Sequence, residues 1–157
     1  MFDTVLDDPV EDLDPAEVFG WPVSLEEAVA GPAGLELAAM LAAAGDPATV
    51  SDYTLIELVK GWDKQVAHAQ AAQAAAIAEL AARRPGAGLI RGISAFAADE
   101  VAAALGLSRR AGEDRLGEAV VWARSLPGTL AALGRGDISL PVARVLAAET
   151  VALDDAQ

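Results

Sequence analysis

Residues 99–116, DEVAAALGLSRRAGEDRL, predict two helices joined by a short turn. Val101 and Leu105 lie on one face of the first helix, at helical spacing. Gly106 supplies the backbone freedom that a tight turn needs. Ser108 is typical of a helix N-cap, because its hydroxyl can accept a hydrogen bond from an amide of the following turn. This order of elements is typical of a helix-turn-helix.

The second helix of such a motif fits the major groove of DNA, with its N-terminal side chains directed at base edges. We therefore expect a DNA-contacting surface on this helix. Its candidate residues are Ser108, Arg109, Arg110 and Arg115.

Two observations weigh against strong DNA binding by this helix. Gly112 stands where such helices usually carry a β-branched core residue, and a glycine inside a helix costs about 1 kcal/mol relative to alanine. Glu113 and Asp114 place two carboxylates on the same helix, and carboxylates repel phosphate. The alternative is a tight helical hairpin that serves only for packing.

Composition favours an all-α fold. Hydrophobic residues make up 54% of the 157 residues and aromatic residues only 4%, so the helices must pack through small side chains. Alternating runs of β-branched and aromatic residues are too short for strands. With no cysteine, the chain has neither a disulfide framework nor a thiolate metal site. We expect no cofactor.

The longest predicted helix runs from Asp52 to about Arg84, where Pro85-Gly86 stops it. An apolar stripe at three-and-four spacing follows its length. The stripe consists of Leu55, Leu58, Val59, Trp62, Val66, Ala69, Gln73, Ile77 and Leu80. We expect later helices of this chain to bury the stripe, and the alternative is the same helix of a second copy. Trp62 and Trp122 are expected to anchor the core.

The remaining elements are predicted from breaks in the pattern. A helix-turn-helix-like unit covers about residues 97–123, and short helices follow it to the C-terminus. His68, the single histidine, is interpreted as a partly exposed helix residue, because one histidine cannot build a metal site.

Charge is distributed unevenly along the chain. The net charge is −13, but residues 1–60 hold 13 acids against Lys60 alone, and Arg83 to Ala148 hold nine arginines against six acids. A weakly basic helical region behind an acidic segment can bind nucleic acid, although solvated surface charge is the more common explanation.

Residues 1–50 are interpreted as an acidic, Pro- and Gly-rich leader that is partly ordered, with short helices at 24–30 and 35–44. The Phe19-Gly20-Trp21-Pro22 cluster is expected to tuck back onto the helical domain, with a docking peptide as the alternative. The chain shows neither a secretory leader nor an apolar run long enough for a bilayer, so we expect a cytoplasmic protein without a membrane partner.

Three segments together carry a resemblance to a known family. They are IELVKGWDKQVAHAQAAQAAAIAELAARR (56–84), FAADEVAAALGLSRRAGEDRL (96–116) and LPGTLAALGRGDISLPVARVLA (126–147). In this order and spacing they resemble domain-of-unknown-function family 222, also called the 13E12-repeat family. The most specific parts are the Leu-Ser-Arg-Arg turn and the Gly-Asp-Ile-Ser segment that precedes Ala143-Arg144-Val145.

The resemblance implies a domain that usually precedes an HNH endonuclease module in GC-rich bacterial genomes, within mobile or repeated sequences. An HNH site needs a pair of histidines, or a histidine and an asparagine, around one divalent metal. This chain has one histidine, so we expect no catalysis within it. Because the family domain is longer, residues 51–157 are expected to be its N-terminal part, truncated. Relatives often carry a histidine where this chain has Val142.

The leading hypothesis from the sequence is a non-catalytic helical module associated with double-stranded DNA. A helical interaction module is the main alternative, with a second copy or the missing part of the family domain as its partner. A truncated gene remnant without function is the third. Arg144 can either reach phosphate or cover an apolar helix face with its stem.

Overall fold

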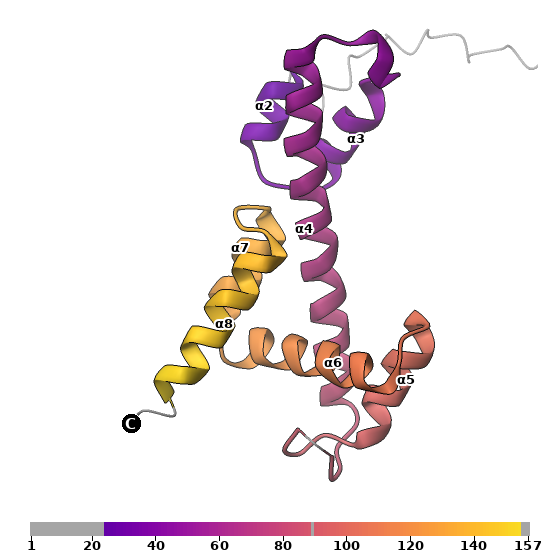
Figure 1. The fold of residues 1–157 in the computed structure, drawn as a ribbon, viewed down its shortest axis with the longest axis vertical. Helices are drawn as coiled ribbons and strands as arrows, with labels where there is room; N and C mark the ends of the chain where they lie inside the picture. The colour runs from indigo at the N-terminus through magenta and orange to yellow at the C-terminus, as the bar shows by residue number, and fades with distance from the viewer. Residues whose placement is uncertain (1–23, 89, 155–157) are drawn as a thin grey trace, which may run out of the picture.

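The computed structural model describes residues 24–88 and 90–154. Within them the chain forms seven α-helices, one short 3-10 helix and no strand, which confirms the predicted all-α fold (Figure 1). The elements are α2 (Leu25–Ala30), α3 (Leu35–Ala43), η1 (Pro47–Thr49), α4 (Asp52–Ala82), α5 (Ala95–Leu105), α6 (Arg109–Arg124), α7 (Pro127–Arg135) and α8 (Leu140–Asp154).

Helix α4 runs along the long axis of the molecule, and both apolar clusters of the protein are built on it (Figure 1). It spans 31 residues, which at the α-helical rise gives a length of about 46 Å. The Ser51 hydroxyl accepts a hydrogen bond from the Thr54 amide at 3.2 Å and so caps its N-terminus. The long predicted helix is therefore confirmed, with its C-terminal end two residues earlier than expected.

A small apolar cluster joins α2 and α3 to the first half of α4. Its buried members are Ala28, Val29, Leu37, Leu41 and Leu58. The Gln65 side chain of α4 both accepts a hydrogen bond from the Gly34 amide and donates one to the Gly34 carbonyl. Residues 24–50 thus pack onto α4, and the two short helices predicted there are confirmed. The Phe19-Gly20-Trp21-Pro22 cluster lies outside the described residues.

The larger core surrounds the second half of α4. Trp122, Leu133 and Ile93 are its largest fully buried side chains. Four alanines supply most of the α4 contribution, namely Ala67, Ala71, Ala74 and Ala81. Small side chains on α4 let α6 and α7 pack closely against it, because the spacing of two helices follows the side chains at their contact. The expectation that Trp122 anchors the core is confirmed.

The predicted apolar stripe of α4 is buried only in part. Leu58 and Ile77 lie in the two cores, but Val59, Trp62 and Val66 are 67%, 50% and 52% exposed. The remaining members are half-buried (Leu55, Leu80) or exposed (Ala69, Gln73). The expectations that this whole stripe is buried by the chain and that Trp62 anchors the core are wrong. The physical reason is that the contacts of α4 with other helices are made mostly by its small residues, so Val59, Trp62 and Val66 face outward.

Candidate functional sites

The turn between α5 and α6 forms as the sequence predicts. Gly106 ends α5 in the left-handed conformation, with φ at +63°. The Ser108 hydroxyl then accepts a hydrogen bond from the Ala111 amide at 3.3 Å, and α6 begins at Arg109. Two helices, a glycine turn and a serine cap therefore follow in the expected order.

Gly112 is buried where α5 and α6 touch. A Cβ atom at this position would lie 2.7 Å from the Ala98 carbonyl oxygen and 2.7 Å from the Ala102 Cβ. Real side-chain contacts do not reach such distances, so no larger residue fits without moving a helix. The lack of a side chain at Gly112 therefore permits the close contact between the two helices.

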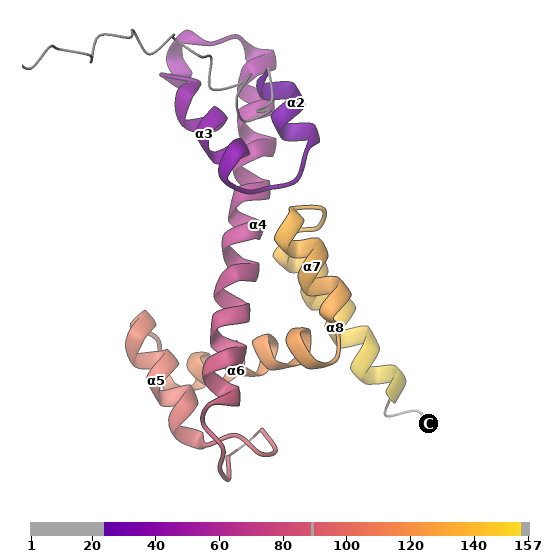
Figure 2. The ribbon, with the colours of Figure 1, turned by 180° about the vertical axis from the view of Figure 1, so that it is seen from behind.

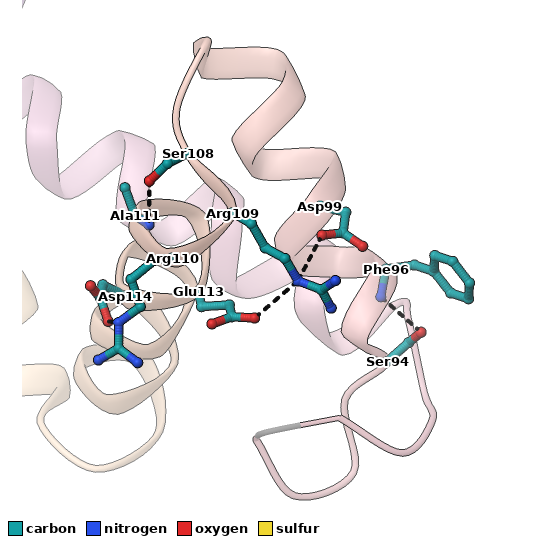
Figure 3. A network of polar contacts seen from close by, with 9 residues as sticks. All are labelled: Ser94, Phe96, Asp99, Ser108, Arg109, Arg110, Ala111, Glu113 and Asp114. Carbon is teal, nitrogen blue, oxygen red and sulfur yellow. Dashed lines mark hydrogen bonds and ion pairs between the residues drawn. The ribbon is translucent and has the colours of Figure 1, made fainter.

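The two leading arginines of α6 are exposed but already paired (Figure 3). Their side chains are 65% exposed at Arg109 and 80% exposed at Arg110. Arg109 Nε lies 3.5 Å from an Asp99 oxygen and 3.3 Å from a Glu113 oxygen. Arg110 Nε lies 3.2 Å from an Asp114 oxygen. Two guanidinium groups thus face three carboxylates, so the helix end carries no surplus of positive charge.

The other two predicted DNA contacts are less available. The Ser108 hydroxyl already accepts the capping hydrogen bond. Arg115 lies half-buried further along α6, and it forms no ion pair with any residue in the described part of the chain. The four candidates therefore lie on α6 or at its N-cap, but only two of them present an exposed guanidinium group.

A hollow of about 220 Å³ lies beside these arginines, between α5, α6 and the loop before α5. Its rim carries Arg109, Arg110, Glu113 and Asp114, and its floor includes Ile93 and Leu116. Because its rim carries two arginines and two carboxylates, the hollow has no surplus of positive charge.

His68 has a structural role. Its Nδ1 atom lies 2.6 Å from the Gly134 carbonyl oxygen, which links α4 to α7. The side chain is half-buried, in agreement with its interpretation as a partly exposed helix residue. Among residues 24–88 and 90–154, no three His, Asp or Glu side chains gather as a metal ion would require.

Arg144 forms an ion pair that joins α8 to α6. Its guanidinium makes two hydrogen bonds to the Glu118 carboxylate, at 2.6 and 3.0 Å, and so ties α8 to α6. These bonds favour the charged form and raise the pKa of Arg144. Val142, on the same helix, is exposed.

A second candidate surface emerges on α4. We define the α4 seam as Leu55, Val59, Trp62, Val66, Ala69, Gln73, Ala76 and Leu80, all of them half-buried or exposed. Successive members are four and three residues apart, the spacing of a coiled-coil contact face. In Figure 2, the second half of α4 lies in front of α6 and no helix covers it. The sequence indicated most of this stripe, but not its exposure.

A groove of about 200 Å³ borders the seam where α5 approaches α4. It is lined by Gln73, Ala76, Ile77, Leu80, Glu100, Val101, Ala104 and Leu105. Leu105 is 40% exposed, so the groove continues the apolar surface of the seam onto α5.

Comparison with known proteins yields no relative. No family model, no curated protein and no solved structure matches this chain. The resemblance to the 13E12-repeat family therefore stays a prediction. No helix in the described part of the chain is both long and apolar enough to span a membrane.

Proposed function

We propose that this chain is a helical protein–protein interaction module whose contact surface is the α4 seam. The observation that carries the proposal is the exposure of Val59, Trp62 and Val66 in one continuous stripe. Covering apolar surface is worth about 25 cal/mol per Å². Exposed apolar side chains that stand alone need no explanation, whereas contiguous ones mark contact sites.

The support of α4 suits it to this task. Its first half is held by α2 and α3, and its second half by α5, α6 and α7. A helix whose backbone is already fixed at both ends lowers the ordering cost of binding, because only its side chains must still be immobilised. An amphipathic helix of a partner can then lie along the seam, since anchors at three-and-four spacing are the usual contacts between helices.

Photo-crosslinking in cells tests this function. With benzoylphenylalanine in place of Val66, we expect an adduct heavier than the chain, because position 66 lies within the contact. The matched control replaces Ala75, which is exposed on α4 but lies outside the seam. The adduct must also disappear when Trp62→Glu is added, because a carboxylate there opposes burial. An unchanged chain mass at position 66, or equal adducts at positions 66 and 75, contradicts the proposal.

Association with DNA is a second candidate, as a non-catalytic module of an HNH-endonuclease-type protein. The observation in its favour is the α5–turn–α6 geometry, with Arg110 80% exposed at the start of α6. The carboxylates of Asp99, Glu113 and Asp114 weigh against it, because each is engaged with an arginine that DNA would need.

Fluorescence anisotropy with a labelled duplex tests DNA binding. For a DNA-binding protein, binding weakens steeply with salt. Arg109→Ala with Arg110→Ala is then expected to lower the affinity, and to reduce the slope of log affinity against log salt concentration by about two, one for each lost phosphate contact. The matched variant, Glu113→Gln with Asp114→Asn, is expected to strengthen binding because it frees Arg110 and leaves Arg109 paired with Asp99 alone. Absence of binding by either folded protein at low salt removes this candidate.

A further inference from the structure

We infer that the partner of the α4 seam is a second copy of this chain, bound so that the two α4 helices run antiparallel. This inference rests on the proposed function and adds the identity and direction of the partner. Three features of the seam carry it: the order of its side-chain sizes, the groove beside it and the charges at its ends.

The order of sizes along the seam is complementary to its own reverse. Large residues gather in the first half, whereas the second half holds the smaller Ala69, Gln73 and Ala76 before it ends at Leu80. Two antiparallel copies centred between residues 67 and 68 bring each first-half residue against a second-half residue. The resulting pairs are Leu55 with Leu80, Val59 with Ala76, Trp62 with Gln73, and Val66 with Ala69. Three of these four layers therefore combine a larger and a smaller side chain.

A parallel dimer lacks this complementarity. In it each residue meets its own counterpart, so that the two Trp62 indoles collide in one layer. The layers of Ala69 and Ala76 then face each other across a gap, and a gap forfeits the dispersion contacts of its lining. The size order thus favours the antiparallel direction.

The groove between α4 and α5 receives the largest side chain of the seam. In the antiparallel pair, Trp62 of one copy lies opposite Gln73 on the partner, at the mouth of the partner's groove of about 200 Å³. The indole ring can enter between Ala76 and Leu105. A buried indole N–H usually finds a hydrogen-bond partner, and the amide oxygen of Gln73 is the acceptor that faces it.

The charges at the two ends of the seam agree with this direction. Asp52 lies three residues before Leu55, and Arg83 lies three residues after Leu80. The antiparallel pair therefore places Asp52 of each copy opposite Arg83 of the other, whereas a parallel pair places like charges together. Arg83 pairs with Glu79 of its own helix at 2.7 Å, and its side chain is still 68% exposed.

Single cysteines provide a sharp test, because the chain has none of its own. Val59→Cys and Ala76→Cys are prepared as separate proteins and mixed under mild oxidation. We expect a disulfide between the two variants in the mixture and little in either variant alone. In the antiparallel pair residue 59 lies opposite residue 76 of the other copy, whereas neither residue lies opposite its own counterpart. Ala75→Cys replaces Ala76→Cys in the control mixture, which is expected to stay uncrosslinked. A dimer of Val59→Cys with itself, or no crosslink in the mixture, overturns the inference.

Sedimentation of the cysteine-free chain completes the test. We expect its mass to approach twice 16.0 kDa as concentration rises, and Trp62→Ala to raise the dissociation constant at least tenfold. Trp62 is half-exposed, so helicity of the variant is expected to stay unchanged. A monomer at all concentrations overturns the inference. The photo-adduct at position 66 then separates the two proposals: an adduct that is not twice the chain mass keeps the interaction function, and no adduct removes both.

Discussion

Tyr53 and Glu26 form a contact between the first turn of α4 and α2. The hydrogen bond from the Tyr53 hydroxyl to the Glu26 carboxylate raises the pKa of Tyr53 above its ordinary value of 10.0. Burial and the charges of Glu26 and Glu57 act in the same direction, whereas Lys60 opposes them. The contact stabilises the protonated phenol in the folded protein. Its contribution to stability is therefore complete below pH 10 and is lost as the pH rises through the raised pKa.

We predict that Glu26→Gln lowers the pKa of Tyr53 toward 10, because the substitution removes a carboxylate acceptor and its negative charge. The chain has one tyrosine, so ultraviolet absorbance of the tyrosinate reports this residue alone. Glu36→Gln, on α3, is the matched control and is expected to leave the titration unchanged. A titration midpoint that is the same in both variants and the parent chain would show that the contact is absent in solution.

Helix α6 contains two glycines, Gly112 and Gly117, whose surroundings differ. At Gly112 the missing side chain brings α6 against Ala98 and Ala102 of α5. A Cβ atom at Gly117, five residues later on the same helix, would meet no atom outside that stretch of helix closer than Ile90 Cδ1 at 4.0 Å. The two glycines share the same helix and differ in their surroundings, so they form a natural pair for comparison.

Alanine substitutions at these two positions are predicted to have opposite effects. Gly117→Ala stabilises the protein by about 0.5–1 kcal/mol, because alanine has the higher helix propensity. Gly112→Ala destabilises it by about 1–3 kcal/mol, since overpacking outweighs the same propensity gain. Urea denaturation measures both free energies of unfolding. Equal stabilisation by the two substitutions would mean that α5 and α6 are not in close contact.

The elements were predictable from local signals, but their buried faces were not. Ser51 and Ser108 mark helix starts by their own chemistry, so these two starts could be placed from the sequence. The exposure of Trp62 could not be predicted from the sequence. A large apolar side chain is expected in the core before alanine, but the contacts between helices use the alanines of α4. At the candidate DNA-binding surface, the pairing of Arg109 with Glu113 could be predicted from their helical spacing. The pairing of Arg109 with Asp99 could not, because Asp99 lies on α5 and meets Arg109 only in the folded protein.

At the scale of the whole molecule, the two cores meet midway along α4. The Ala33 amide, between α2 and α3, donates a hydrogen bond to the Arg135 carbonyl of α7 at 2.8 Å. Lys64 Nζ donates to the Val29 carbonyl at 2.9 Å, and His68 contacts the Gly134 carbonyl. The α2–α3 unit is thus held by polar contacts with backbone groups in addition to its apolar cluster.

We predict that Gln65→Ala loosens the α2–α3 unit selectively. It removes two hydrogen bonds to Gly34, worth about 1–3 kcal/mol together. Hydrogen exchange is expected to accelerate for amides of α2 and α3 and to stay unchanged in α6. Gln70→Ala, also half-buried on α4, is the control without such an effect. Uniform acceleration across the chain would show instead that the two cores unfold together.

The alanine-lined contact face of α4 has a consequence for how this protein tolerates mutation. Most cores fail when a large side chain is trimmed, and here that vulnerability is concentrated in a few residues such as Trp122 and Leu133. At Ala67, Ala71, Ala74 and Ala81 there is little to trim, and the damaging change is growth. Along this contact, sequence drift is therefore constrained by an upper limit on side-chain volume.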